Sequence, residues 1–301
     1  MAHDILLWGT YYFDLIYSGL VELPSLGKEV FSRSFEALPG GCFTTAVALR
    51  RLDVDVAWAC DFGDDFFSSY VLRAAQDHGI NQELFLKHSF PIRRVTTALS
   101  HTKDRAFISF ADDFPCTPIL DVLRRDPPRW ILLPHLHYGD SYREFFTAAH
   151  QAGARIYMDC QSTPATLSTH GVADAIRSVE VFAPNAAEAL KLTGAHTAEG
   201  ALTVLAELAP LIVIKLGDQG AIARQAGATS RVGGLPVQVL DTTGAGDCFN
   251  AGFMYGLLRG APVEVCLEYA NLCGAISTTA HGGKAAPFSH QLEAAKQRGA
   301  W

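Results

Sequence analysis

A glycine-rich segment that ends in an aspartate is the strongest chemical signal in the sequence. Residues 241–247 read DTTGAGD, and the stretch that follows carries Phe249, Phe253 and Leu257 at four-residue spacing, which is the pattern of one helix face. Glycine lets backbone N–H groups approach a ligand, and the unpaired amides and the dipole at a helix start attract phosphate oxygens. The segment therefore predicts a turn built from two glycines that leads into a helix and forms an anion site.

Asp247 stands at the mouth of this predicted anion site. A carboxylate there can accept the proton of a hydroxyl group as that hydroxyl attacks a phosphoryl group. The ordinary pKa of an aspartate is about 3.9, so positioning would matter more than basicity. The competing interpretation is that Asp247 only caps its helix, for which aspartate is well suited.

The stretch from 241 to 253 resembles the C-terminal signature of the PfkB, or ribokinase-like, carbohydrate kinases, DTTGAGDxFxAGF. The resemblance implies ATP-dependent phosphorylation of a hydroxymethyl group on a small sugar or sugar-like substrate, with Mg²⁺ as a cofactor. It makes Asp247 the catalytic base and assigns the anion-binding amides to Gly244, Ala245, Gly246 and Asp247.

The same resemblance places the acceptor near the N-terminus. Asp14 lies five residues after Gly9, as in the family element whose aspartate binds substrate hydroxyls, and its two oxygens can accept from adjacent hydroxyl groups. Gly40 and Gly41 resemble the diglycine that lets the backbone approach the sugar. Arg105 lies on a predicted lid strand, from which it could reach the substrate.

Several residues near this predicted acceptor site depart from the family pattern. Cys42 stands where sugar-phosphate kinases often carry Lys, which favours a non-phosphorylated substrate. Thr44 replaces a common Asn, and Tyr12 replaces the Asn of ribokinase itself, which disfavours ribose. A nucleoside kinase of the same family is an alternative, with Tyr11, Tyr12 or Phe43 stacking on the base. A non-catalytic sugar or nucleotide sensor is another.

Two motifs resemble the nucleotide side of the family site. Asn185 and Glu188 match NxxE, in which Glu organises Mg²⁺-bound water and Asn a phosphate; the alternative is a helix cap with its capping-box partner. Lys215, Gly217 and Gly220 match the nucleotide-binding TxGxxG with Lys in place of Thr. Lys215 could therefore contact phosphate as a point charge, or be an ordinary strand-end cation.

Three further residues complete the resemblance. Asn271 lies on the helix that borders the adenine pocket in the family. Asp241 and Thr243 resemble part of a site at which relatives hold a monovalent cation such as K⁺ through oxygen atoms. Residues 159–164 contain no Arg, which argues against a keto-deoxy acid or fructose as the substrate.

Apolar runs of strand length alternate with stretches of helical spacing along the chain, and this predicts a three-layer α/β/α sandwich with a mostly parallel central sheet. The whole of 1–301 is predicted to be one kinase domain. Two-residue alternation at Val30–Leu38 and Thr96–Phe110 predicts strands exposed on one face. They would form a small β lid inserted at about 12–38 and 92–110, and lids of this kind could pair two subunits into a homodimer.

Composition narrows the class of partner. The chain is 49% hydrophobic and 18% charged, with a formal net charge of -7, which argues against a nucleic-acid or anionic-membrane surface and favours a small molecule. The first apolar run, at 5–8, is too short for a signal sequence or a membrane span, so we expect a cytoplasmic protein.

Overall fold

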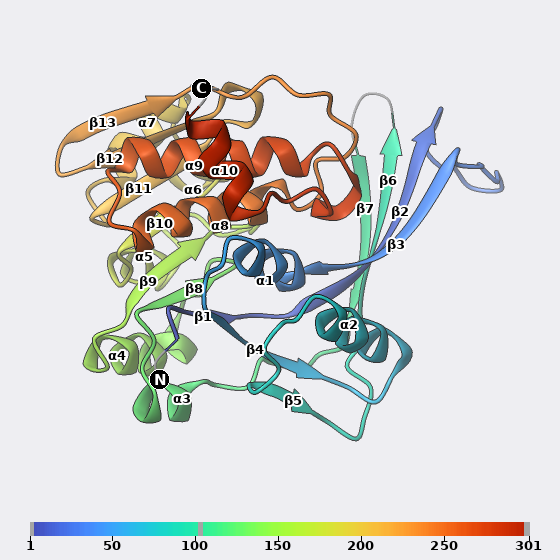
Figure 1. The fold of residues 1–301 in the computed structure, drawn as a ribbon, viewed down its shortest axis with the longest axis horizontal. Helices are drawn as coiled ribbons and strands as arrows, with labels where there is room; N and C mark the ends of the chain where they lie inside the picture. Colours follow the sequence, from blue (N-terminus) through green and yellow to red (C-terminus); the bar gives the residue numbers. More distant parts are fainter. Residues whose placement is uncertain (1–2, 102–104, 298–301) are drawn as a thin grey trace.

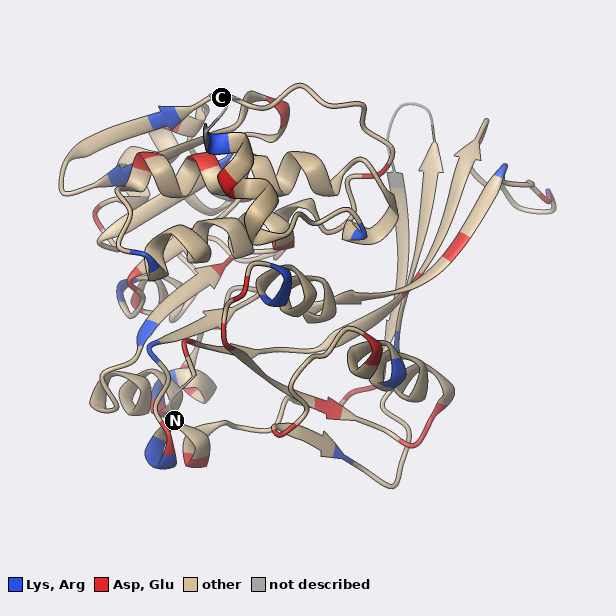
Figure 2. Ribbon diagram, viewed as in Figure 1, with Lys and Arg blue, Asp and Glu red and all other residues tan. Residues whose placement is uncertain are grey.

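The computed structural model describes residues 3–101 and 105–297, and its strands form two sheets (Figure 1). The large sheet has nine strands, and a smaller sheet of four strands stands at one side of the main body. No helix in the described residues is long and apolar enough to cross a lipid bilayer. Basic and acidic residues are interspersed over the helices and connecting segments (Figure 2).

In spatial order, the large sheet consists of β13 (Ala228–Val232), β12 (Ala221–Gln225), β11 (Leu211–Lys215), β10 (Val181–Ala183), β9 (Arg155–Asp159), β8 (Trp130–Leu133), β1 (Ile5–Trp8), β4 (Val56–Phe62) and β5 (Phe85–Lys87). The strands from β11 to β5 are parallel, whereas β12, near one edge, pairs antiparallel with both β11 and β13. Parallel strands covered on both faces are continuously apolar, and every residue of β1 and β8 is buried.

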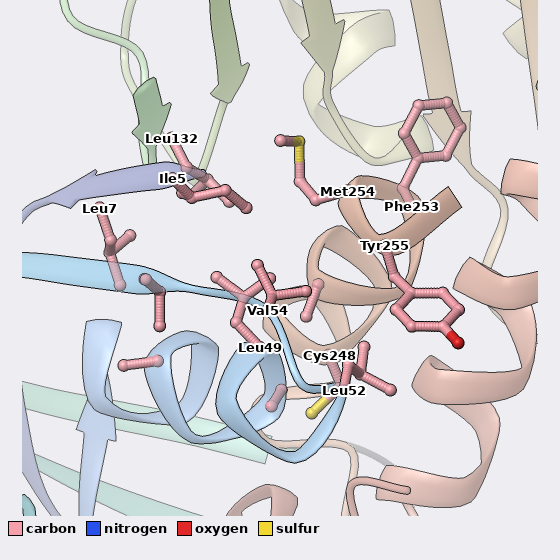
Figure 3. Close-up of a cluster of buried hydrophobic side chains, with 14 of the residues drawn as sticks. Ile5, Leu7, Leu49, Leu52, Val54, Leu132, Cys248, Phe253, Met254 and Tyr255 are labelled. Atoms are coloured by element: carbon pink, nitrogen blue, oxygen red, sulfur yellow. The ribbon is translucent and has the colours of Figure 1, made fainter. Parts of the chain in front are cut away.

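Helices cover both faces of the large sheet. One face, which carries Ile5 and Leu7, packs against α1 (Cys42–Arg51), α2 (Phe66–Asp77), α8 (Ala245–Leu258), α9 (Val263–Ser277) and α10 (Ser289–Gln297). The other, which carries Leu6 and Trp8, packs against α3 (Leu120–Arg125), α4 (Arg143–Gln151), α5 (Val172–Arg177), α6 (Ala186–Thr193) and α7 (Ala198–Leu205). Figure 3 shows Ile5 and Leu7 above Leu49 of α1, with Met254 of α8 beside them. The predicted three-layer sandwich is confirmed.

Three short 3₁₀ segments complete the helices: η1 (Asp140–Tyr142), η2 (Gly217–Gln219) and η3 (His281–Gly283). The small sheet has the order β3 (Ser34–Gly41), β2 (Tyr11–Leu20), β6 (Arg94–His101) and β7 (Arg105–Ala111). β2 pairs antiparallel with β3 and parallel with β6. The segments that the sequence predicts to be lid strands therefore lie in one sheet, separate from the large one.

The strand predicted to begin at Val30 begins four residues later, at Ser34. Pairing between β2 and β3 ends at Ser18 and Ser34, and the preceding residues form an exposed connection that turns at Gly27, whose φ is 74°. The prediction was wrong there because two-residue alternation cannot distinguish an exposed extended loop from a strand without knowing its partner.

Candidate active site

The glycine-rich segment forms the start of α8. Gly244 is the residue before the helix, with φ 78°, and the helix begins at Ala245. Only Gly244 needs the left-handed conformation, so the predicted two-glycine turn is wrong in placing Gly246 outside the helix. A Cβ at Gly244 would lie 2.9 Å from Thr44 Cγ2, which is a second reason for glycine at this position.

The amides at this helix start are not equivalent. The N–H of Ala245 donates to the Thr242 carbonyl at 3.2 Å, so this amide closes the turn. Gly246 and Asp247 lie in the first helical turn, where N–H groups have no carbonyl partner within the helix. Asp247 is the third residue of α8, so the interpretation of its side chain as the helix cap is wrong.

The carboxylate of Asp247 is held by a residue that the sequence did not single out. Thr45 Oγ1 of α1 donates to Asp247 Oδ1 at 2.9 Å. Burial, with a smaller contribution from the Asp159 carboxylate, raises the pKa of Asp247 to about 6, although the Thr45 hydrogen bond and the Lys215 ammonium act in the opposite direction. Asp247 is therefore a stronger base than an exposed aspartate.

Asp14 lies in β2, and the neighbouring strand β3 brings the diglycine against it. A Cβ on Gly40 would lie 1.9 Å from Asp14 Oδ2, and Gly41 has φ 60° with its missing Cβ 2.8 Å from the Thr10 carbonyl oxygen. Only glycine fits at position 41, and a side chain at position 40 would displace the Asp14 carboxylate. Burial raises the pKa of Asp14 to about 7, and the carboxylates of Asp247 and Asp241 add to the effect.

A cavity of ≈ 670 Å³ opens beside the start of α8. It brings together the nucleotide-side residues that the sequence predicts: Asn185, Glu188, Lys215, Gly217, Gly220, Gly246, Asp247 and Asn271. An apolar loop also lines it, through Leu235, Pro236, Val237 and Val239. Asn271 donates from Nδ2 to the carbonyl oxygens of Val232 and Gly233 at 3.1 and 3.0 Å, which ties α9 to the end of β13.

Asn185 and Glu188 form a capping box at the start of α6. Asn185 Oδ1 accepts from the Glu188 amide at 2.9 Å, and Glu188 Oε2 accepts from the Asn185 amide at 2.8 Å. The structural alternative for this motif is therefore present, but both side chains also line the cavity. Burial and the Asp159 carboxylate raise the pKa of Glu188, so this carboxylate would gain from a nearby cation.

Lys215 ends β11 and is bound to a second residue that the sequence did not assign to the site. Its Nζ donates to Oδ1 and Oδ2 of Asp159 at 2.8 and 2.7 Å. Asn250 of α8 donates from Nδ2 to Asp159 Oδ2 at 2.6 Å. Asp159 ends β9, a parallel strand that β10 separates from β11. Ligand sites of open α/β sheets lie outside such carboxyl ends, and that position is the signal that could have identified Asp159.

Asp241 lies between the glycine-rich segment and η3. Its Oδ1 accepts from the amide and the hydroxyl of Thr243 at 2.9 and 2.8 Å, and its Oδ2 accepts from the Gly282 amide at 3.0 Å. His281 Nδ1 lies 3.6 Å from the same Oδ2. The carboxylate therefore organises the loop beside the anion site.

Three other predicted residues do not reach the site or lie outside the described residues. Tyr11 is fully buried and donates to the Ile92 carbonyl at 2.6 Å, while Phe43 is buried against His78. Tyr11 therefore cannot stack on a bound base, and Phe43 lines a different cavity, beside Thr44 and His78. Arg105 begins β7, but its side chain lies outside the described part of the structure.

A model of the pfkB family of carbohydrate kinases matches residues 127–289, more than half of the chain. The chain belongs to this family. It is a sugar or nucleoside kinase of the ribokinase type, as its relatives also indicate.

The chain is 25% identical to the ribokinase of Bacillus subtilis over 281 residues, which cover 90% of this chain and 92% of that protein. It is 30% identical over 109 residues to an uncharacterized sugar kinase of Archaeoglobus fulgidus, covering 36% of this chain and 44% of that protein. It is 36% identical over 97 residues to a cytidine kinase of Thermococcus kodakarensis, covering 31% and 34%.

Solved structures show the same fold. Ribokinase of Arabidopsis thaliana, complexed with ribose and ATP, superposes with a TM-score of 0.82 at 20% identity, covering 98% of both chains. A putative ribokinase II from E. coli, in complex with ATP and Mg²⁺, has a TM-score of 0.81 at 20% identity, covering 98% of this chain and 99% of that one. The predicted ribokinase-like fold is thus confirmed.

Proposed function

We propose that this kinase transfers the terminal phosphoryl group of ATP to a hydroxymethyl group of a small, non-phosphorylated sugar or sugar-like molecule. One observation carries the proposal. The carboxylates of Asp14 and Asp247 lie close enough for Asp247 to raise the pKa of Asp14, and Asp247 also stands in the first turn of α8 at the edge of a ≈ 670 Å³ cavity. An acceptor between the two carboxylates would therefore face a phosphate held at the helix start.

The cavity fits a nucleotide because it combines an apolar loop with a helix start. The loop at 235–239 offers an apolar surface to a base, and the amides of Gly246 and Asp247 offer donors to phosphate. Two of the solved structures with this fold are complexes with ATP, one also with ribose and one with Mg²⁺. Glu188, whose pKa is raised by burial, is the residue that would organise water around Mg²⁺, which neutralises phosphate charge when bound.

Side chains and backbone amides of the protein bind the acceptor, take the proton of its hydroxyl group and stabilise the negative charge of the phosphoryl group. Asp14 orients the acceptor by accepting from its hydroxyl groups. Asp247 takes the proton of the attacking hydroxyl as the new O–P bond forms and the bond between the β- and γ-phosphates breaks, and ADP leaves. The amides of Gly246 and Asp247 stabilise the phosphoryl oxygens during transfer.

K⁺ is less well supported than Mg²⁺. Both oxygens of Asp241 already accept hydrogen bonds from Thr243 or Gly282, and His281 Nδ1 lies 3.6 Å from Oδ2. A carboxylate has about four lone-pair sites, so these bonds leave K⁺ as a secondary proposal at Asp241 and Thr243, and no step of the reaction is routed through it.

Two residues near Asp14, Cys42 and Tyr12, support the proposed class of acceptor. Cys42 is 1% exposed, and a buried neutral thiol cannot bind a substrate phosphate, which supports a non-phosphorylated acceptor. Tyr12 shares the Asp14 face of β2 and is half-buried. Because Tyr12 could stack on a base, and because one relative is a cytidine kinase, a nucleoside is the second candidate acceptor.

The small sheet is proposed to act as the lid of this single domain and as a dimer surface. Phe35, Ile108 and Phe110 are each more than half exposed, and the strand register puts all three on the face opposite Asp14. Exposed apolar surface of this kind favours a homodimer, which light scattering would test. We expect the enzyme to act in the cytoplasm.

Coupled ADP release with a panel of sugars and nucleosides tests the proposal. Turnover is expected with at least one acceptor, and Asp247→Asn should reduce kcat about 10²–10⁴-fold while ATP binding measured by calorimetry persists. Asp4→Asn, at the amino end of the central strand β1, is the control and should retain full activity. ATP binding without turnover of any acceptor would instead favour a sensor.

A further inference from the structure

The ion pair between Lys215 and Asp159, which lines the cavity, is more buried than an ion pair on the protein surface. The side chains of Lys215 and Asp159 are 12% and 9% exposed, whereas those of Arg129 and Asp4 are 52% and 35% exposed. Buried pairs of this kind contribute little net stability, because desolvation offsets the attraction between the charges. The position of this pair in the lining of a cavity therefore points to a role other than folding.

The pair is held by a network from three elements. Asp159 of β9 binds Lys215 of β11 through both carboxylate oxygens. Asp159 Oδ2 also accepts from Asn250 Nδ2 of α8 at 2.6 Å, and Oδ1 from the Cys160 amide at 2.7 Å. Tyr157 OH donates to Asn250 Oδ1 at 2.8 Å, so the orientation of the Asn250 amide is fixed as well. Asp159 thus has little freedom to move.

This network places the ammonium beside the predicted phosphate site. A Cβ on Gly246 would lie 3.8 Å from Lys215 Nζ, and Nζ lies 6.0 Å from the centre of the Phe249 ring. Lys215, Gly246 and Asp247 line the same cavity. Of the three N–H groups of an ammonium, two are directed to Asp159, while the contact to Asn250 Oδ1 is long, at 3.4 Å.

We propose that Asp159 and Asn250 are positioning residues that hold the Lys215 ammonium against the first turn of α8, from where it contacts the phosphoryl group being transferred. The inference rests on the kinase function proposed above. It assigns the side chain of Lys215 to the terminal phosphate and gives Asp159 the task of fixing it.

The pair also balances the charge around the base. Lys215 lowers the pKa of Asp247 and Asp159 raises it, so the two effects oppose each other. The other ionisable groups that face Asp247 are Asp14 from β2, Cys42 from α1 and Cys248 of its own helix. Removing one member of the pair should therefore move the pH dependence of the reaction, and removing both should largely restore it.

Four variants test the proposal in the full-length enzyme: Asp159→Asn, Lys215→Met, the double variant, and Asn250→Ala. Lys215→Met should lower kcat about 10²–10³-fold, as loss of one transition-state donor does. Asp159→Asn should lower kcat about 10²-fold through misplacement of the ammonium. The double variant should be no worse than Lys215→Met alone, because residues that act as a unit are not additive.

The pH profile separates positioning from folding. The acid limb of kcat/KM should move to lower pH in Asp159→Asn and to higher pH in Lys215→Met, and return towards the wild type in the double variant. Asn250→Ala, which keeps both charges, should lower kcat without moving the limb. If Asp159→Asn fails to fold, Asn250→Ala tests the positioning role in its place. Asp4→Asn, which breaks an exposed pair of 2.8 Å, is the matched control.

Calorimetry with ATP and with ADP gives a readout that does not need turnover. Lys215→Met should weaken ATP binding at least tenfold more than ADP binding. Equal weakening for both nucleotides, additive losses in the double variant, or normal kinetics in both Asp159→Asn and Asn250→Ala would each overturn the inference. Failure of the wild type to turn over any acceptor, with the ATP-over-ADP difference intact, would instead overturn the proposed function.

Discussion

At the scale of single residues, the site depends on two carboxylates that resist ionisation. Asp247 has a pKa raised to about 6 and Asp14 a pKa raised to about 7, in both cases chiefly by burial. A base with a pKa near the working pH combines a useful ionised fraction with real affinity for a proton. Aspartate can therefore serve here despite its low ordinary basicity.

This basicity predicts the pH dependence of the reaction. Asp247 must be ionised to accept a proton, and Asp14 binds the acceptor as a carboxylate, so kcat/KM should rise with pH through two apparent pKa values of about 6 and 7 that belong to the pair. Initial rates from pH 4.5 to 8.5 would measure this rise, and the residual activity of Asp247→Asn should rise through one ionisation rather than two. A limb near pH 4 in the wild type would contradict a buried base.

The same burial should make Asp14 costly for folding. Its pKa is about 7 in the folded protein, against an ordinary value of 3.8 for an exposed aspartate, so the folded state binds the proton more tightly and stability falls as pH rises through this range. Asp14→Asn should therefore raise the free energy of unfolding by about 4 kcal/mol at pH 8 and by less than about 1 kcal/mol at pH 4. Urea titrations at both pH values would measure it.

Asp112, whose pKa is lowered rather than raised, is the control for this stability prediction. The Arg93 side chain lowers the pKa of Asp112 to about 2, so Asp112→Asn should give no stabilisation at pH 8. A gain at pH 8 in both variants would show that charge removal in general, rather than burial of Asp14, causes the effect.

At the scale of elements, the start of α8 depends on a glycine with two constraints. Gly244 has φ 78° and its missing Cβ lies 2.9 Å from Thr44 Cγ2, whereas Gly260, after the other end of α8, has φ 66° and open space around it. Gly244→Ala and Gly260→Ala should each cost about 1–2 kcal/mol of stability, but only Gly244→Ala should also reduce turnover. Thermal melts and initial rates on both variants would measure the two effects.

The pairing of β2 and β3 makes a second glycine a test of the acceptor site. A methyl group on Gly40 would meet Asp14 Oδ2 at 1.9 Å, and the mobile partner in that clash is the Asp14 side chain. Gly40→Ala should therefore fold, with an acceptor KM raised at least tenfold and a nearly unchanged KM for ATP. Gly233→Ala, at a position with nothing within 4 Å, should leave both KM values unchanged.

Local sequence patterns predicted the helices and strands better than the contacts between side chains that lie far apart in the sequence. The helix predicted to follow the glycine-rich segment begins at Ala245, and its predicted apolar residues Phe249 and Phe253 are buried, because periodicity is a local signal. The partner of Lys215 was not predicted, since Asp159 lies 56 residues away. Thr45 was missed for the same reason: its bond to Asp247 spans 202 residues.

At the scale of the whole molecule, the Lys215–Asp159 pair joins β9, β11 and α8. Lys215→Met should lower the free energy of unfolding by about 3–5 kcal/mol, because it leaves a buried carboxylate without its counter-charge. The exposed pair broken by Asp4→Asn should cost about 0–1 kcal/mol. Urea denaturation of the two variants would compare them, and equal losses would contradict the burial of the first pair.

Asp14 and Asp247 come from strand β2 and helix α8, which lie far apart in the sequence. During synthesis the acceptor half of the site leaves the ribosome long before the phosphate half exists. A nascent chain that carries Asp14 but lacks α8 has no base to use, so a product that ends before α8 is expected to be inert. Phosphoryl transfer therefore requires that α8 has been translated.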